Sequence, residues 1–238
     1  MPFNFRNVLL HLLPILLISA CDRSGSAGPR PHPVAAYSCN ESTGTMVADD
    51  SGGGNSGTLV NATWSPAGHS GGALSFNGTT ARVVVPDMAA LRFVQDMTIE
   101  AWVNPSATVT DDWQAVIYKG HDAYLLGTNA KTGLPIGGGT VGTTAVLASG
   151  VAVLPVNTWT HLAATYDGTT VRLYVNGTEV SSRPATGHLR ESMAPLEIGG
   201  SLADGGTFAG LIDDIRLYSM ALTSAQIQTD MNTPVASR

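Results

Sequence analysis

The sequence is poor in charged and aromatic residues, which make up 13% and 6% of its 238 positions. Only 12 side chains are basic against 18 acidic ones, for a formal net charge of −6. Proteins that bind nucleic acid present a basic surface, so this balance argues against nucleic acid and against anionic lipid as partners. An apolar stretch from Val8 to Ala20 is too short to span a bilayer comfortably, and His11 and Pro14 interrupt it. A permanent transmembrane helix is therefore not expected.

Signatures of catalysis are scarce as well. We expect no His-Glu-x-x-His zinc helix, no phosphate-binding Gly-x-x-x-x-Gly-Lys loop and no Gly-x-Ser-x-Gly nucleophile elbow. A retaining glycoside hydrolase needs two carboxyl groups about 5 to 5.5 Å apart. The predicted strands offer Glu100 alone, because Asp213 and Asp214 are neighbours on one strand and point to opposite faces. The sequence therefore predicts a binding protein without catalytic residues rather than an enzyme.

The first twenty residues are organised as a signal peptide. Arg6 precedes the apolar stretch, and the small residues Ser19 and Ala20 stand directly before Cys21. This arrangement resembles the lipobox of bacterial lipoproteins, which implies cleavage before Cys21, lipid on Cys21 and a place in the cell envelope, periplasmic or surface-exposed. The alternative is an ordinary secretory signal cleaved near Ala20 or Ala27. Without residues 1–20 the chain carries 11 basic and 18 acidic residues, a net charge of −7.

The exported part is predicted to be a short tether followed by one domain. Residues 21–34 are rich in Ser, Gly, Pro and Ala, which is typical of a flexible linker. Residues 35–232 are long enough for a single substantial core. If Cys21 carries lipid, Cys39 has no partner for a disulfide, so we expect Cys39 to be a small buried hydrophobic residue.

Short runs of alternating apolar residues, separated by Gly, Asn, Asp and Pro, predict an all-β fold. Asp167-Gly168 and Asn176-Gly177 favour hairpin turns, because these dipeptides tolerate consecutive positive φ angles. A short terminal helix is indicated where Thr223 and Gln226 can form a capping box. The expected strands are 73–76, 81–85, 97–103, 115–118, 124–127, 144–149, 158–166, 170–175, 195–199 and 210–218.

A series of motifs from about Tyr37 to Ile227 resembles the laminin-G-like family of concanavalin A-like domains. The resemblance implies a jelly-roll sandwich of two stacked antiparallel sheets. The matching stretches, in the family's order, are Asp49–Gly57, Gly72–Gly78, Thr98–Val103, Asn157–Gly168, Leu173–Gly177 and Gly210–Tyr218, ending at Ala221-Leu222.

The same resemblance implies a structural calcium ion between the Gly-rich segment 49–57 and the acidic pair near the end of the chain. Calcium takes six to eight oxygen ligands, and glycines let backbone carbonyls turn inward. The implied ligands are Asp49, Asn55 and Asp213. Strict alternation would place Asp213 on one face with Leu211, Ile215 and Leu217, so that one carboxylate of the acidic pair is directed toward the core. The alternative is that Asp213 only accepts hydrogen bonds from backbone amides of the Gly-rich loop.

The tryptophans divide into two predicted groups. Trp102 and Trp159 lie in the strongest strand motifs and are expected to pack in the core. Trp113, Tyr124 and Asn129 lie in a less constrained region, and we predict that they bind a ligand there. The alternative for Trp113 is that it caps the edge of the core. His161 is expected to be a strand residue that a neighbour satisfies.

The sequence is compatible with two kinds of binding function and, as a third alternative, with an enzyme. The first is carbohydrate binding of the lectin type, which predicts that Trp113 is exposed. The second is protein interaction or adhesion without affinity for sugars, which predicts a larger apolar patch or a free sheet edge. The third is a polysaccharide hydrolase or lyase on the same architecture, and fold alone does not separate the three.

Overall fold

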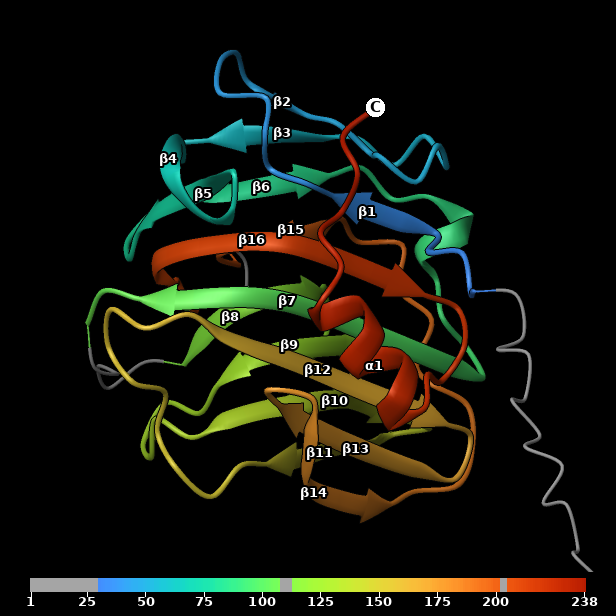
Figure 1. Ribbon diagram of the computed structural model, residues 1–238. Coiled ribbons are helices and arrows are strands. Elements are labelled where there is room, and N and C mark those ends of the chain that lie inside the picture. Colours follow the sequence, from blue (N-terminus) through green and yellow to red (C-terminus); the bar gives the residue numbers. More distant parts are fainter. Residues whose placement is uncertain (1–29, 108–112, 202–204) are drawn as a thin grey trace, which may run out of the picture. The chain divides into compact units, whose positions relative to one another are not determined.

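Two antiparallel sheets of eight strands each hold nearly all the regular structure in the computed structural model, which describes residues 30–107, 113–201 and 205–238 (Figure 1). The predicted signal peptide, Cys21 and the tether up to residue 29 lie outside the described residues. The strands are β1 (Ala35–Tyr37), β2 (Met46–Val47), β3 (Gly57–Val60), β4 (Thr63–Ser70), β5 (Gly72–Asn77), β6 (Arg82–Val85), β7 (Asp96–Pro105), β8 (Gln114–Lys119), β9 (Tyr124–Thr128), β10 (Pro135–Val141), β11 (Thr144–Ser149), β12 (Thr160–Asp167), β13 (Thr170–Val175), β14 (Thr178–Pro184), β15 (Leu196–Ile198) and β16 (Ala209–Tyr218). The helices are the 3₁₀ helix η1 (Ala89–Leu91) and α1 (Ser224–Met231).

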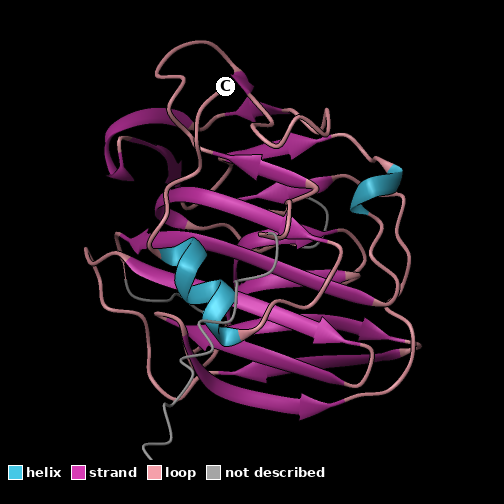
Figure 2. Ribbon diagram, turned by 45° about the vertical axis from the view of Figure 1, so that its right-hand side comes forward, coloured by secondary structure: helices cyan, strands magenta, loops and turns pink. Residues whose placement is uncertain are grey.

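The sheets form a sandwich, as predicted. Sheet A has the order β14-β13-β12-β7-β16-β5-β4, with β1 paired to the second half of β16, and sheet B has the order β11-β10-β9-β8-β15-β6-β3-β2. One apolar core lies between the inner faces of the two sheets. The helix α1 lies across the outer face of sheet A, where it forms a smaller apolar cluster with β12, β13 and β16 (Figure 2). No helix of the described part is long and apolar enough to cross a membrane.

The predicted turns and cap follow their local chemistry. Asn176 and Gly177 have φ angles of 49° and 72° and join β13 to β14, as expected for a two-residue hairpin. In the turn before β13 only Gly168 has a positive φ, because the Asp167 carboxylate closes this turn by accepting from backbone N–H groups. Thr223 forms the predicted capping box at the start of α1. Cys39 is fully buried, also as predicted.

The sequence did not predict β10, which contains three consecutive glycines. A Cβ atom on Gly137 would lie 2.5 Å from the Cβ of Ala164 in sheet A, so only glycine lets the sheets approach this closely here. Tertiary packing makes this segment a strand of sheet B, between the edge strand β11 and β9.

The alternation predicted for β16 is wrong, because a bulge interrupts it. The pairing of β16 with β7 shifts between Asp213 and Arg216, and Asp214 has a φ of 47°. Ile212 therefore lies in the core together with Ile215 and Leu217, although strict alternation would put Ile212 on the opposite face of the strand. Asp213 and Asp214 are both buried.

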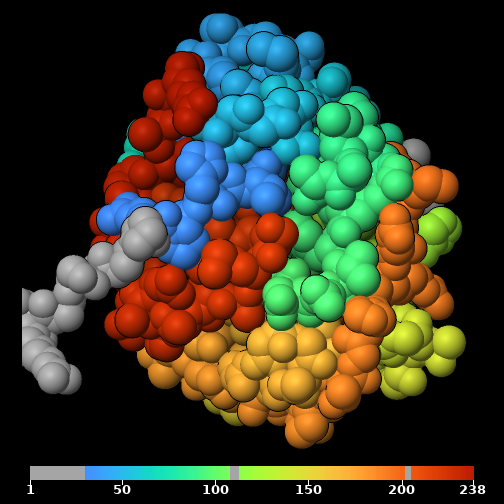
Figure 3. All heavy atoms as spheres, turned by 90° about the vertical axis from the view of Figure 1, so that its right-hand side faces the viewer, coloured from blue at the N-terminus to red at the C-terminus, as the bar shows by residue number. Residues whose placement is uncertain are grey.

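The chain after residue 232 belongs to the same compact unit, which spans Pro31–Arg238. The amide of Val235 donates to Asp214 Oδ1 at 2.7 Å, and the amide of Arg238 donates to Asp50 Oδ1 at 2.8 Å. Figure 3 shows the first residues of the fold, in blue, packed beside these last ones, in red. The final residues therefore tie the outer face of sheet A to the Gly-rich loop.

Candidate functional site

The Gly-rich loop is organised around the Asp49 carboxylate. Its Oδ1 accepts from the amides of Ala36 and Ser51, both at 3.0 Å, and its Oδ2 accepts from Asn55 N at 2.9 Å and Asn55 Nδ2 at 3.3 Å. Burial raises the pKa of this carboxyl, but the hydrogen bonds from Ser51, Asn55 and Ala36 together hold it below its usual range. Asn55 Oδ1 is buried without a hydrogen-bond partner.

Asp213 takes no part in these hydrogen bonds. Its Oδ2 accepts from the amide of Ser70 at 2.9 Å, and its Oδ1 accepts from the amide of Asp214 at 2.7 Å. The alternative role predicted for Asp213, holding amides of the Gly-rich loop, therefore belongs to Asp49.

The residues predicted as calcium ligands do not fit that ion in this arrangement. Calcium needs six to eight oxygens, whereas N–H donors already point at the carboxylate oxygens of Asp49 and Asp213, and of the side-chain oxygens of the three residues only Asn55 Oδ1 is without a partner. Among the described residues no group of three or more His, Cys, Asp or Glu side chains could hold a metal ion. Asp49, Asn55 and Asp213 serve the fold as hydrogen-bonding groups.

The structure does not bring Trp113, Tyr124 and Asn129 into one site. Tyr124 is fully buried in the core, where it stacks on Phe93 at 4.9 Å between ring centroids. Trp113 is half-buried and packs on the opposite face of sheet B, 5.2 Å from the ring of Tyr118. Tyr124 as a ligand-binding residue is therefore wrong, because the pleat of the sheet turns it inward.

Asn129 closes the turn that follows β9. Its Oδ1 accepts from the amides of Lys131 at 3.1 Å and Thr132 at 3.2 Å. An acceptor used in this way stabilises the loop. The register of β8 and β9 pairs Gln114 with Thr128, so Trp113 is next in line with Asn129, whereas Tyr124 lies in the core.

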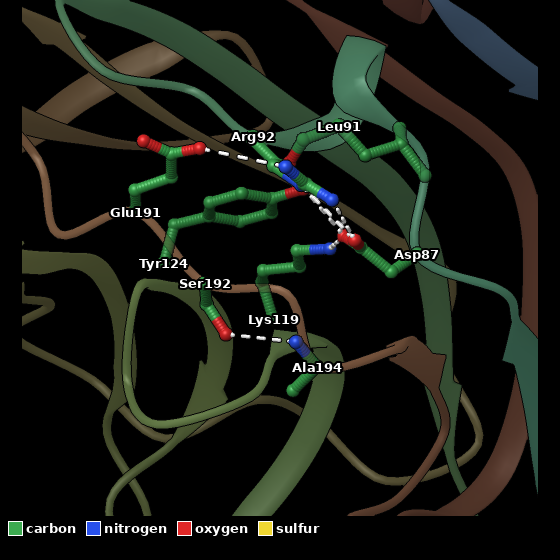
Figure 4. A network of polar contacts seen from close by, with 8 residues as sticks. All are labelled: Asp87, Leu91, Arg92, Lys119, Tyr124, Glu191, Ser192 and Ala194. Carbon is green, nitrogen blue, oxygen red and sulfur yellow. Dashed lines mark hydrogen bonds and ion pairs between the residues drawn. The ribbon is translucent and has the colours of Figure 1, made fainter.

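A network of charges connects η1 to the end of β8 (Figure 4). Lys119 Nζ lies 2.7 Å from Asp87 Oδ1, and Arg92 Nη2 lies 2.5 Å from Asp87 Oδ2. The hydrogen bonds from Arg92 and Lys119 lower the pKa of Asp87 to about 2. Glu191 lies 3.6 Å from the other end of the Arg92 guanidinium. These charges satisfy one another, so the network is a structural one.

Polar and aromatic side chains meet instead on the outer face of sheet A. The register of three adjacent central strands places His161 of β12 opposite Trp102 of β7, and Trp102 opposite Asp213 of β16. Trp102 and Trp159 are both partly exposed rather than part of the core, which corrects the prediction for them. The tip of the β4–β5 hairpin covers this row, because Ser70 is held by Asp213.

The exposed imidazole of His69 lies flat on Trp102. The ring centroids are 3.6 Å apart with an interplanar angle of 13°, and Trp159 lies edge-on to His69 at 6.0 Å. Beside this stack is a hollow of about 300 Å³ between the hairpin and the segment that follows α1. We call it the His69 hollow, and its lining includes His69, Ser70, Trp102, Asp214, Met231 and Asn232.

A layer of buried charge lies on the same face of sheet A. Glu100 and His161 have no exposed surface, and neither the Glu100 carboxyl oxygens nor the His161 ring nitrogens have a hydrogen-bond partner. Arg216 Nη1 and His161 Nε2 each lie 3.9 Å from a Glu100 oxygen. Burial raises the pKa of Glu100 well above its usual range and lowers that of His161 to about 3. The expectation that a neighbour satisfies His161 is therefore wrong for its side chain.

The segment Gly68–Gly72 has the literal spacing Gly-x-Ser-x-Gly. A nucleophile elbow requires its serine at a strand-to-helix turn, whereas Ser70 ends β4 and only Gly71 separates it from β5. Asp213 holds the Ser70 amide, and the His69 ring is stacked on Trp102. The segment is a hairpin that shapes the hollow and has no elbow geometry.

A sequence signal for this face existed in β7. Thr98, Glu100 and Trp102 alternate with Ile99 and Ala101, so alternation groups Trp102 with a glutamate rather than with the core. Trp102 was nevertheless predicted to lie in the core, because it belongs to a strand motif of the family that the sequence resembles.

The sandwich topology and the apolar core between the two sheets define a jelly-roll domain. A family model described as the concanavalin A-like lectin/glucanases superfamily matches residues 77–228, so the chain belongs to that family in its laminin-G-like form. Over 80 residues the chain is 38% identical to mouse pappalysin-1 and 36% identical to human pappalysin-1. Those stretches are 32% of this chain and only 5% of either relative.

Solved structures share the fold at low sequence identity. Domain 4 of AbnA, a GH43 extracellular arabinanase from Geobacillus stearothermophilus solved with arabinotriose, superposes with a TM-score of 0.68 at 22% identity, over 85% of this chain and 100% of that one. The binding domain of Paraclostridial Mosquitocidal Protein 1 gives 0.65 at 13% identity, over 84% and 52% of the two chains. Botulinum neurotoxin type C, whose cell entry depends on two ganglioside molecules, gives 0.64 at 11% identity, over 84% and 51%.

Proposed function

We propose that this chain is an exported protein, anchored to a bacterial membrane through lipid on Cys21, whose β-sandwich binds carbohydrate without catalysing a reaction. The observation that carries the proposal is the His69 hollow, where an exposed aromatic stack lies beside a carboxylate and an amide. Ligand sites combine apolar and aromatic walls with a few polar groups that set orientation. A sugar ring presents the matching surfaces, an apolar face and a rim of hydroxyl groups.

Each lining residue has a place in such a complex. One face of His69 covers Trp102, so the apolar face of a sugar would rest on the other, exposed face of the imidazole. Asp214 offers carboxylate oxygens that can accept from hydroxyl groups, and Asn232 offers an amide. A volume of about 300 Å³ is at the lower end for small-molecule sites, which suits a terminal sugar or a short segment of a chain.

The structural neighbours support this proposal in general terms. One of these proteins was solved with arabinotriose, and the cell entry of another depends on gangliosides. The similar domains of the mosquitocidal protein and of botulinum neurotoxin serotype G are binding domains. The fold is therefore one that other proteins use to hold oligosaccharides.

The test is calorimetric titration of the protein with a panel of plant and microbial oligosaccharides. Binding should weaken at least tenfold in His69→Ala, because His69 is exposed and forms the outer surface of the stack. His188→Ala is the matched control, since His188 is also exposed but lies away from the hollow. Equal binding by wild type and His69→Ala would move the site elsewhere, and no binding to any sugar would refute the proposal.

The anchor has a separate test. Replacing Cys21 with Ser should shift the protein from the membrane fraction to the soluble fraction of an expressing bacterium and remove the mass added by lipid. An unchanged distribution would indicate the ordinary secretory signal instead.

Protein interaction is the second candidate, and one observation favours it. The loop before β12 exposes Val151 by 82% and Val153 by 58%, although apolar side chains at such positions usually gain from a partner. Capture of a single envelope protein by wild type, lost in a Val151→Ser, Val153→Ser variant, would favour this function if the sugar panel gives no binding.

A further inference from the structure

The His69 hollow offers acceptors for hydroxyl groups but no fixed positive charge. Among the described residues that line it, none is Lys or Arg. Burial lowers the pKa of His69, so its imidazole is neutral at neutral pH. The aromatic stack and the amide of Asn232 are uncharged as well.

The one cation of the neighbouring buried layer is already engaged. Arg216 is 5% exposed, and its guanidinium lies 3.9 Å from Glu100 and donates to the carbonyl of Thr233. Its burial beneath the C-terminal segment leaves it unable to reach a ligand in the hollow without displacing that segment.

The carboxylate of the hollow is fixed in place. Asp214 Oδ1 accepts from the amide of Val235 at 2.7 Å, and the backbone of Asp214 is held in the bulge of β16. Asp213, the adjacent residue, is buried and bound to the Ser70 amide of the hairpin. An anionic ligand entering the hollow would therefore meet carboxyl groups in its wall and no basic side chain.

Resting on the proposed function, we infer that the His69 hollow selects neutral sugars and excludes sugars that carry a carboxylate, such as uronic and sialic acids. Recognition of a carboxylate relies on charge-assisted donors, chiefly Arg and Lys. Like charges brought together in a binding site oppose binding strongly and so provide specificity. Neutral hydroxyl groups, in contrast, are good donors to a carboxylate.

The experiment compares a neutral sugar with a pair of ligands, an acid and its methyl ester, that have the same chain and differ in charge. Calorimetric titration of the unmodified protein uses neutral galactan oligosaccharides, oligogalacturonides in the free-acid form and the same oligogalacturonides as methyl esters. We expect the neutral and esterified sugars to bind, and the free acid to bind at least tenfold more weakly at low ionic strength.

A variant tests the same inference from the protein side. Asp214→Asn keeps an oxygen for the Val235 amide, and Asn tolerates the φ of 47° at this position. It should bind the free acid at least fivefold more tightly than wild type, whereas Asp230→Asn, a control in α1, should not. Free acid bound as tightly as the ester would overturn neutral-sugar selection and leave carbohydrate binding intact. Failure of all sugars to bind would instead overturn the proposed function itself.

Discussion

Two groups of charged side chains lie in different parts of this domain, one partly exposed around Asp87 and one buried around Glu100, and they differ in how their charges are paired. Around Asp87, the ammonium of Lys119 and the guanidinium of Arg92 lie at 2.7 and 2.5 Å from carboxylate oxygens. Around Glu100, the closest charged nitrogen lies at 3.9 Å and no hydrogen bond reaches either oxygen. The first group holds η1 on sheet B, whereas the second lies on the outer face of sheet A that also carries the hollow.

The two groups are expected to contribute differently to the stability of the fold. A buried charge with close partners is costly to disturb, because its removal leaves the partner uncompensated. A buried polar group without partners is destabilising as it stands, and such groups in native proteins occur preferentially at functional sites. Acid-to-amide substitutions, which change charge but hardly change shape, distinguish the two situations.

Asp87→Asn should have the largest effect. Lys119 would keep its charge in a buried position without an ionised acceptor, so we expect a loss of about 3 kcal/mol in the free energy of unfolding. Urea denaturation at pH 7 measures it. Glu191→Gln, at an exposed end of the same network, should change stability by less than about 0.5 kcal/mol. If the two variants behave alike, the Asp87 network is not the structural element described above.

Asp49→Ala extends the comparison to a carboxylate whose partners are amide N–H groups rather than cations. Several N–H groups of the loop would lose their acceptor, for a cost of about 2 kcal/mol. The loss should be the same with calcium and with a chelator, since both Asp49 oxygens are engaged without an ion. A loss that appears only in the presence of calcium would restore a calcium site to this loop.

Asp213, a buried carboxyl that accepts from the amides of Ser70 and Asp214, extends the comparison to pH. Burial raises its pKa to about 7, so the folded state favours the protonated carboxyl. The stability that this proton confers is complete below the unfolded pKa of about 4 and is lost as pH rises through 7. The decrease in unfolding free energy from pH 5 to pH 8 should shrink by roughly 1–2 kcal/mol in Asp213→Asn. An unchanged slope would mean that Asp213 is ionised in the fold at pH 5.

The fold was largely predictable, because local signals and global packing agree along most strands. Turn dipeptides such as Asn176-Gly177 and the capping box at Thr223 act within a few residues, so the sequence alone reveals them. The strands β2, β3, β4 and β14 were not among those expected, nor was β10, whose glycines are required by the close approach of Ala164 in the other sheet.

The site was not predictable in the same way, since it depends on contacts between distant segments. His69 reaches Trp102 from the tip of another hairpin, and Asp213 holds Ser70 across 143 positions of sequence. A bulge at Asp214, which no local sequence pattern predicts, reverses which residues of β16 face the core. The alternation of Glu100 with the core residues of β7 was the one local signal of the polar face.

Glu100→Gln should have the smallest effect and is the sharpest test of the contrast with Asp87. Burial raises the pKa of Glu100 well above its usual range, which favours the uncharged carboxyl, and an amide has the same shape. We expect a change in unfolding free energy of less than about 1 kcal/mol. Denaturation of both acid-to-amide variants under one set of conditions makes the comparison direct. A loss as large as that of Asp87→Asn would mean that Glu100 is ionised and paired with Arg216, and that the two groups of charges are alike.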